Sequence, residues 1–167
     1  MKKRIFLRIC SIVGLSLLLL AQSSFGQDSA GQKKLGIQEM LNSREFVFRA
    51  QFANPMRGPS RPLTTPYELK IDRDTLTSNL PYFGRVYAAP INPTRSVLDF
   101  VSHRFSYKWT TPKKGRWELT IKIEDNQDVQ QFFLTVFDNG SGTLSVTFSS
   151  RDGISFNGYL QQSDKPR

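Results

Sequence analysis

The feature that most constrains the fold is a two-residue hydrophobic period that recurs through most of the chain. Trp117, Leu119 and Ile121, for example, alternate with charged and polar residues. Because successive side chains of a β-strand point to opposite faces of a sheet, this period is typical of strands with one buried face. Turn sequences such as Asn139-Gly140 separate these patterns at intervals of roughly eight to twelve residues. Such spacing indicates antiparallel strands joined by short turns.

The sequence therefore predicts an all-β fold over residues 45–161, built as a single antiparallel meander. The ordered series of strands from Val97 to Leu160 favours a curled sheet or a lipocalin-like barrel, with a sandwich as the alternative. Apolar residues spaced three and four apart predict one short N-terminal helix, Gln32 to Ser43, within residues 27–44. The alternative for that segment is a tether, and residues 162–167 are expected to form a polar tail.

The first 26 residues have the layout of a secretory signal peptide. A basic start, Lys2-Lys3-Arg4, precedes an apolar run over residues 9–20, and small residues follow. This run is shorter than the roughly 20 residues that a membrane-spanning helix needs. We expect cleavage after Gly26, or alternatively after Ser23, and export to the periplasm or the extracellular space without a transmembrane segment in the mature protein.

Cysteine usage and charge narrow the function classes. Cys10 is the only cysteine and does not follow the apolar run, so we expect no lipid anchor and no cysteine in the mature chain. Disulfides, thiolate nucleophiles and cysteine-bound metals are then excluded. Four of the 23 basic residues lie in the signal, which leaves 19 against 14 acidic residues. This mildly basic balance, without a block of like charges, does not indicate nucleic-acid binding.

The Leu80–Tyr87 stretch is the least regular and most aromatic part of the chain. Pro81 cannot donate to a sheet ladder, and Gly84 indicates a turn that a side chain would obstruct. One interpretation is that the stretch crosses one end of the β-domain and plugs it with Phe83, while Pro81 and Gly84 shape the turn. The other is a ligand- or partner-binding loop, because tyrosine and arginine are enriched in binding hot spots. Its candidate binding residues are Tyr82, Phe83, Arg85 and Tyr87.

The sequence shows no catalytic constellation. His103 is the only histidine, which excludes a histidine-rich metal site, and we interpret it as a strand-end residue. The pairs Asp72/Asp74 and Asp125/Asp128 lie in predicted turns, where Asp is favoured for its local hydrogen bonds. We therefore expect no catalytic residues, no bound metal and no cofactor.

Asp99 is the one acidic residue that falls inside an apolar strand pattern, Val97 to Val101. Apolar residues on both faces of that pattern predict deep burial. A buried carboxylate needs a cationic partner, and Arg85, Arg95 and Arg104 are the candidates.

The sequence resembles a family of small exported bacterial proteins, domain of unknown function 4251. The resemblance implies a signal peptide, a single β-rich domain, an origin in Gram-negative bacteria and no established activity, and it supplies no catalytic residues. It covers nearly all of the mature chain. The matching features are Phe46 and Phe48 before Ala50, Asn54-Pro55 with Gly58, Tyr67-Glu68-Leu69, the Leu80–Tyr87 motif, the Phe105 to Lys108 strand, Asn139-Gly140, and Ser155-Phe156-Asn157-Gly158.

These observations favour an exported, non-enzymatic β-domain that binds a protein or a small apolar ligand at the end carrying the Leu80–Tyr87 loop. The alternatives are a structural component of the cell envelope and, less favoured, a carboxylate-dependent hydrolase. The sequence does not decide whether the interior of the β-domain is hollow or filled.

Overall fold

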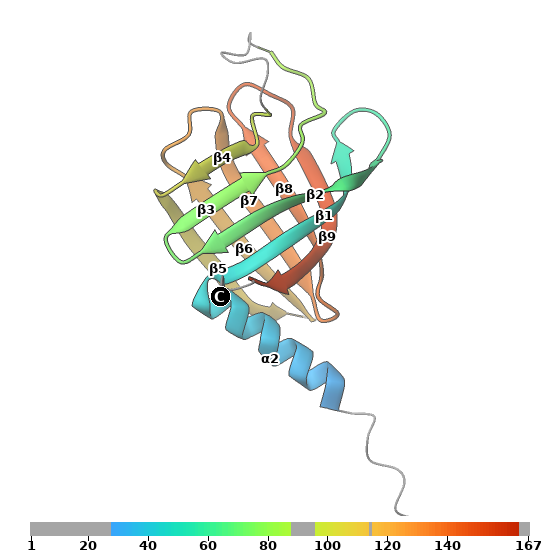
Figure 1. Cartoon of the computed structure of the whole chain (residues 1–167), viewed down its shortest axis with the longest axis vertical. Helices are drawn as coiled ribbons and strands as arrows, with labels where there is room; N and C mark the ends of the chain where they lie inside the picture. Colours follow the sequence, from blue (N-terminus) through green and yellow to red (C-terminus); the bar gives the residue numbers. More distant parts are fainter. Residues whose placement is uncertain (1–27, 88–95, 114, 164–167) are drawn as a thin grey trace, which may run out of the picture. The chain divides into compact units, whose positions relative to one another are not determined.

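The computed structural model describes residues 28–87, 96–113 and 115–163. In this part of the chain, nine strands form one antiparallel sheet in the order β4-β3-β2-β1-β9-β8-β7-β6-β5, curled into a nearly closed barrel (Figure 1). The predicted all-β meander with a short N-terminal helix is confirmed. The strands are β1 Glu45–Pro55, β2 Arg61–Asp72, β3 Thr75–Asn79, β4 Asp99–Ser102, β5 Phe105–Lys113, β6 Arg116–Ile123, β7 Val129–Phe137, β8 Ser141–Phe148 and β9 Ile154–Gln162, and the helix is α2 Asp28–Ser43.

Large apolar side chains fill the described interior of the barrel. Phe46 and Phe48 of β1, Trp117 of β6, Phe132 of β7 and Phe156 of β9 are all fully buried. If a cavity large enough to hold water lay against these five side chains, part of their surface would be accessible to solvent. Because all five are fully buried, they pack directly against other atoms of the protein. The interior that they line is a packed core rather than a lipocalin-like ligand cavity.

Strand β1 changes face at a bulge. Its pairing with both neighbours shifts between Ala50 and Phe52. Phe46, Phe48 and Ala50 are buried as their alternation predicts, but Phe52 is 45% exposed and Ala53 is buried instead. One extra residue in a strand turns every later side chain to the other face. The expectation that Phe52 faces the core was therefore wrong.

Strand β2 begins earlier than its prolines suggest. The sequence predicts a loop from Asn54 to Pro66, whereas β1 continues to Pro55 and β2 starts at Arg61. Over its first residues β2 pairs with β1 alone, because its pairing with β3 begins only at Glu68. Proline has no N–H to donate to a neighbouring strand, so it is tolerated where one edge of a strand has no hydrogen-bonded neighbour.

Strand β4 is a short edge strand, which corrects the expectation of deep burial. It pairs with β3 only. Val101 is 55% exposed and Asp99 is exposed, because the outer face of an edge strand meets solvent. The predicted buried carboxylate was wrong, and Arg95, one of its candidate partners, lies outside the described residues.

Hydrogen bonds to one carboxylate fix the connection between the two edge strands, β4 and β5. The carboxylate of Asp125, after β6, accepts hydrogen bonds from Ser102 Oγ at 2.5 Å and from the N–H groups of His103 and Arg104 at 2.9 and 3.0 Å. Burial alone would raise the pKa of Asp125, but these three donors outweigh it and hold the pKa below its ordinary value. Asp125 thus holds the short β4–β5 connection against the β6–β7 turn.

The C-terminal half of α2 packs on the barrel. Ile37 and Leu41 are buried, whereas Leu35 is 69% exposed. The Tyr107 hydroxyl of β5 donates to the Leu41 carbonyl at 2.9 Å, and the Arg44 carbonyl accepts from the Arg73 N–H at 2.9 Å. The helix ends as predicted at Ser43 but begins earlier than predicted, at Asp28.

The expected signal peptide and the last part of the expected polar tail, residues 164–167, lie outside the described residues. Where the structure does describe the chain, it contains no helix with the length and apolar character needed to cross a membrane.

Candidate functional site

The Leu80–Tyr87 segment begins as part of the core. Leu80 and Pro81 are buried. The Leu80 N–H donates to the Leu98 carbonyl at 3.3 Å, and the Leu80 carbonyl accepts from Ser96 Oγ at 2.7 Å. The first two residues of the segment are therefore fixed against the approach to β4, whereas Phe83, the residue expected to form the plug, is 36% exposed.

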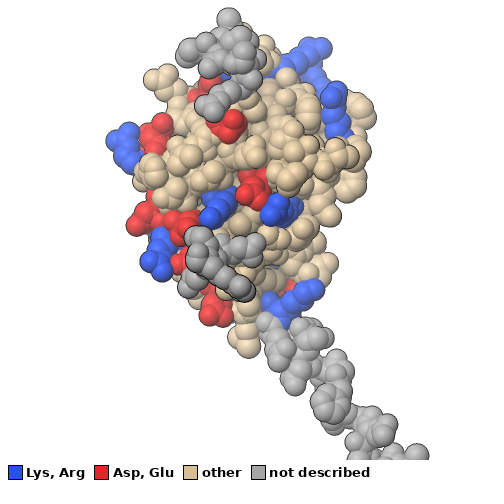
Figure 2. Space-filling model, viewed as in Figure 1, with Lys and Arg blue, Asp and Glu red and all other residues tan. Residues whose placement is uncertain are grey.

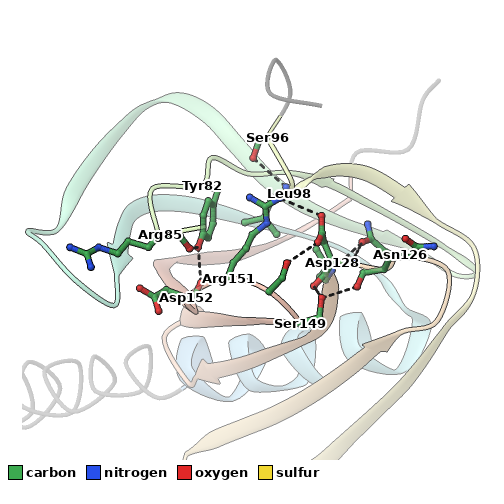
Figure 3. Close-up of polar contacts among 12 residues, drawn as sticks. Tyr82, Arg85, Ser96, Leu98, Asn126, Asp128, Ser149, Arg151 and Asp152 are labelled. Atoms are coloured by element: carbon green, nitrogen blue, oxygen red, sulfur yellow. Dashed lines mark hydrogen bonds and ion pairs between the residues drawn. The ribbon is translucent and has the colours of Figure 1, made fainter. Parts of the chain in front are cut away.

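Tyr82 connects the segment to the β8–β9 turn by a hydrogen bond. Its hydroxyl lies 2.8 Å from the Arg85 carbonyl oxygen and 2.9 Å from that of Asp152, and it donates to them (Figure 3). Its ring packs edge-on against Phe148, with centroids 5.1 Å apart. Burial, and then the negative charge of Asp152, raises the pKa of Tyr82, so the hydroxyl is a protonated donor at neutral pH.

Gly84 makes room for this arrangement. A Cβ atom at Gly84 would overlap the Tyr82 hydroxyl, which is already committed to two carbonyl groups. The expectation that a side chain would obstruct the turn at this position is confirmed.

The second half of the segment pairs with the β8–β9 turn. Val86 forms a single antiparallel bridge with Arg151. The Tyr87 N–H donates to the Ser150 carbonyl, and the Asp152 N–H donates to the Arg85 carbonyl, both at 3.1 Å. The sequence predicts a third strand from Arg85 to Ala88, but the structure has only this bridge, and Ala88 lies outside the described residues.

Asp152 is the central acid of this end of the barrel. It is 7% exposed, and its Oδ1 accepts a hydrogen bond from the Tyr87 hydroxyl. Its Oδ2 is buried, has no hydrogen-bond donor among the described residues, and lies 4.0 Å from Arg57 Nε. The hydrogen bond to Asp152, together with burial, raises the pKa of Tyr87. Sequence reasoning missed Asp152, because Arg151-Asp152-Gly153 reads as an ordinary turn.

A second layer of polar contacts supports the β8–β9 turn. The Arg151 guanidinium lies 5.7 Å from the centre of the Tyr82 ring, and its Nη2 lies 3.4 Å from Asp128 Oδ2 (Figure 3). Ser150 Oγ donates to Asp128 Oδ1 at 3.2 Å. Asp128 thus binds the β8–β9 turn, whereas Asp125 holds the β4–β5 connection.

The outer side of this end exposes aromatic, aliphatic and basic side chains. Tyr87 is 66% exposed and Met56 is 68% exposed, although the Tyr87 hydroxyl is tied to Asp152. The Arg61 guanidinium lies over the Phe83 ring, 4.8 Å from its centroid. Figure 2 shows basic side chains gathered over the β1–β2 connection. We call this area the loop-end surface, made of Met56, Arg57, Arg61, Phe83, Arg85, Val86 and Tyr87.

The four residues predicted to bind a ligand or partner thus divide into two groups. Phe83, Arg85 and Tyr87 lie on the loop-end surface, and Figure 3 shows the Arg85 side chain extending away from Tyr82 and the polar network. Tyr82 is half-buried and its hydroxyl is bound to backbone carbonyls. The motif therefore contains one residue that anchors the segment and three that the segment presents to solvent.

The other polar candidates have local partners. The His103 ring lies 3.3 Å from Thr75 Oγ1, while the His103 N–H is bound to Asp125. Asp72 lies 4.0 Å from Lys70 Nζ. No group of three or more His, Cys, Asp or Glu side chains converges on a metal site in the part of the chain that the structure describes.

Comparison with known proteins supports the fold and the family. A crystal structure of a DUF4251 family protein from Bacteroides eggerthii DSM 20697 is similar at a TM-score of 0.57 and 17% sequence identity, over 78% of this chain and 87% of that one. No curated protein matches the sequence. The family model described as "Domain of unknown function (DUF4251)" matches residues 29–160. The chain belongs to the DUF4251 family.

Proposed function

We propose that this protein is an exported, non-enzymatic β-domain that binds a partner at the loop-end surface. The observation that carries the proposal is the contrast within one segment. Tyr82 and the Asp152 network hold the backbone of residues 82–87, while Phe83, Arg85 and Tyr87 stay at the surface. Aromatic side chains on a fixed backbone bind well because little conformational freedom is lost on association, and arginine adds several hydrogen-bond donors.

Of the two ligand classes, a protein is favoured over a small apolar molecule. Small-molecule sites are usually concave and enclose most of the ligand. The core residues that would line an internal cavity, such as Phe48 and Phe132, are instead fully buried against their neighbours. Exposed Met56, Val86 and Tyr87 offer apolar area on the outside of the barrel, as the centre of a protein interface does.

Export is the second part of the proposal. It rests on the basic start, the short apolar run and the small residues that follow it. The intact mass of the protein isolated from the producing cell should correspond to a chain that begins at Gln27. A full-length mass, or a chain retained in the cytoplasm, would contradict export.

The binding proposal is tested by native mass spectrometry of the exported protein with two paired substitutions. Arg85→Ala should lose a co-purifying partner at unchanged thermal stability, because Arg85 extends away from the polar network (Figure 3). Phe83→Ala should weaken the partner and also lower the unfolding temperature, because it removes the ring under Arg61. Loss of stability alone in both variants would identify the segment as scaffold, and a defined homo-oligomer without another partner would favour a structural envelope role.

A further inference from the structure

Two guanidinium groups of the loop-end surface have no acidic partner in the described chain. Arg61 lies against the Phe83 ring and Arg85 extends outward. Within residues 28–87, 96–113 and 115–163, no carboxylate forms an ion pair with either side chain. Among the described residues, no acid therefore competes with an anion from another molecule for their N–H donors.

The third arginine is held loosely. Arg57 Nε lies 4.0 Å from Asp152 Oδ2, at the limit of an ion pair, and the Arg57 side chain is exposed. Asp152 itself is buried. The outward-facing charge of the loop-end surface is consequently positive, in a protein whose expected mature form carries only a mild excess of basic residues.

Arg61 suits a carboxylate in particular. Its guanidinium carbon lies 4.8 Å from the centre of the Phe83 ring, a distance at which a cation–π attraction acts. Two parallel N–H groups of a guanidinium match the two oxygens of a carboxylate. The contact with Phe83 limits the freedom that Arg61 would lose when it binds such a group.

We propose that the loop-end surface recognises an acidic segment of a protein, with carboxylates at Arg57, Arg61 and Arg85 and an apolar side chain at Met56 or Tyr87. This inference rests on the proposed function and specifies the chemistry of the partner. The exposed aliphatic side chains of Met56 and Val86 favour a polypeptide over an acidic polysaccharide, because a sugar chain has no aliphatic side chains to cover them.

The test uses the mature protein labelled with ¹⁵N and the synthetic peptide Glu-Glu-Leu-Glu-Glu-Leu. Backbone shifts should change at Arg57, Arg61 and Tyr87 when the peptide is added. The same peptide with Gln in place of Glu should bind about tenfold more weakly or not detectably, since each lost charge-assisted bond reduces affinity. Binding of the acidic peptide should weaken at higher salt, as screening of exposed charges requires.

Two sets of substitutions distinguish a specific binding site from non-specific attraction to a basic protein. The triple variant Arg57→Ala, Arg61→Ala, Arg85→Ala should weaken peptide binding about tenfold or more. The matched variant Lys108→Ala, Arg116→Ala, Lys122→Ala removes the same charge from exposed positions of β5 and β6 and should change binding less than about twofold. Arg61→Lys keeps the charge but loses the planar fork, and it should give an intermediate loss.

Three results would overturn the proposal. The two triple variants could lose peptide affinity equally, or the Gln peptide could bind as well as the Glu peptide. The third result is that neither peptide changes the backbone shifts of the protein. Polygalacturonate that shifts the same residues while the peptide does not would assign the site to an acidic polysaccharide instead. If native mass spectrometry retains a protein at this surface and the acidic peptide fails, only the acidic chemistry is wrong. If no partner is retained either, the proposed function fails with it.

Discussion

Tyr82 and Tyr87 lie five residues apart and bind the same turn at different depths. The Tyr82 hydroxyl binds main-chain carbonyls beneath the surface, whereas the Tyr87 hydroxyl binds the Asp152 carboxylate and leaves its ring exposed. The sequence predicts both as binding residues because both are tyrosines in an irregular, aromatic stretch. Their different roles depend on Asp152, which is 65 and 70 residues away along the chain. No local pattern could have revealed this.

The anchoring role of Tyr82 predicts a specific loss of stability. Tyr82→Phe removes the hydroxyl but keeps the ring contact with Phe148, so it should lower the free energy of unfolding by about 1–2 kcal/mol. Tyr159→Phe is the matched control, because the Tyr159 side chain lies at the surface of β9, and it should change stability by less than about 0.5 kcal/mol. Urea unfolding of both variants measures the difference. Equal stability would show that Tyr82 does not anchor the segment.

Two glycines predict opposite effects of the same substitution. A Cβ atom at Gly158 of β9 would overlap the Arg49 carbonyl oxygen of β1, so Gly158→Ala should destabilise the protein by about 3 kcal/mol or more. A Cβ atom at Gly36 of α2 would meet nothing within 4 Å beyond the helix's own backbone, so Gly36→Ala should stabilise the helix by about 1 kcal/mol. Denaturant midpoints that move in the same direction would contradict the close approach of β1 and β9.

At the scale of elements, the period of two predicts most strands correctly. It does so because β6, β8 and β9 keep one face in the core along most of their length, as their alternating burial shows. It fails where pairing changes: at the bulge after Ala50, which turns Phe52 outward, and at β4, whose edge position exposes Val101. A strand's partner and its place in the sheet are tertiary facts, so apolar residues alone could not reveal them.

Asp125 gives the closure of the sheet a pH dependence. Its pKa is lowered in the folded protein, so its stabilising contribution is present above the unfolded pKa of about 3.9 and is lost as the pH falls through the folded value. Asp125→Ala should therefore lower stability at pH 7 by about 0.5–1 kcal/mol, since three hydrogen bonds to the carboxylate are lost but its exposure to solvent weakens each of them. The difference from the unsubstituted protein should shrink below about pH 4.

Urea unfolding at pH 7 and pH 3 measures this change. Asp72→Ala is the comparison, because Asp72 lies 4.0 Å from Lys70 in an exposed pair, and such pairs contribute little. A cost of Asp125→Ala that is the same at both pH values would contradict the role assigned to the carboxylate.

At the scale of the whole β-domain, the C-terminal half of α2 belongs to the core. Leu41→Ala should lower the free energy of unfolding by about 2–5 kcal/mol, because it empties a fully buried position. Leu35→Ala, on an exposed position of the same helix, should change it by less than about 0.5 kcal/mol. Thermal unfolding compares the two, and similar small effects would show that the helix is a tether, the alternative that the sequence left open.

The fold class, the helix and the family could be predicted because each depends on patterns within short segments. The candidate site could be predicted only as a segment. Its surface also needs Met56 and Arg57 from the β1–β2 connection and Arg61 from the start of β2, and its scaffold needs Asp152 from the β8–β9 turn. Long-range strand pairing brings these elements together, as where Pro55 of β1 pairs with Ile154 of β9, so the sequence indicates the loop but not the surface that the loop completes.

The central claim is that this end of the barrel holds a binding surface in place. Site-specific photo-cross-linking in the producing cell tests it most directly, with a photoreactive phenylalanine analogue at Tyr87 and, as the control, at Tyr159 of β9. We predict one discrete cross-linked species from Tyr87, reduced in the Arg85→Ala background, and none from Tyr159. Equal cross-linking from both positions, or none from Tyr87 in a correctly folded and exported protein, would contradict the account.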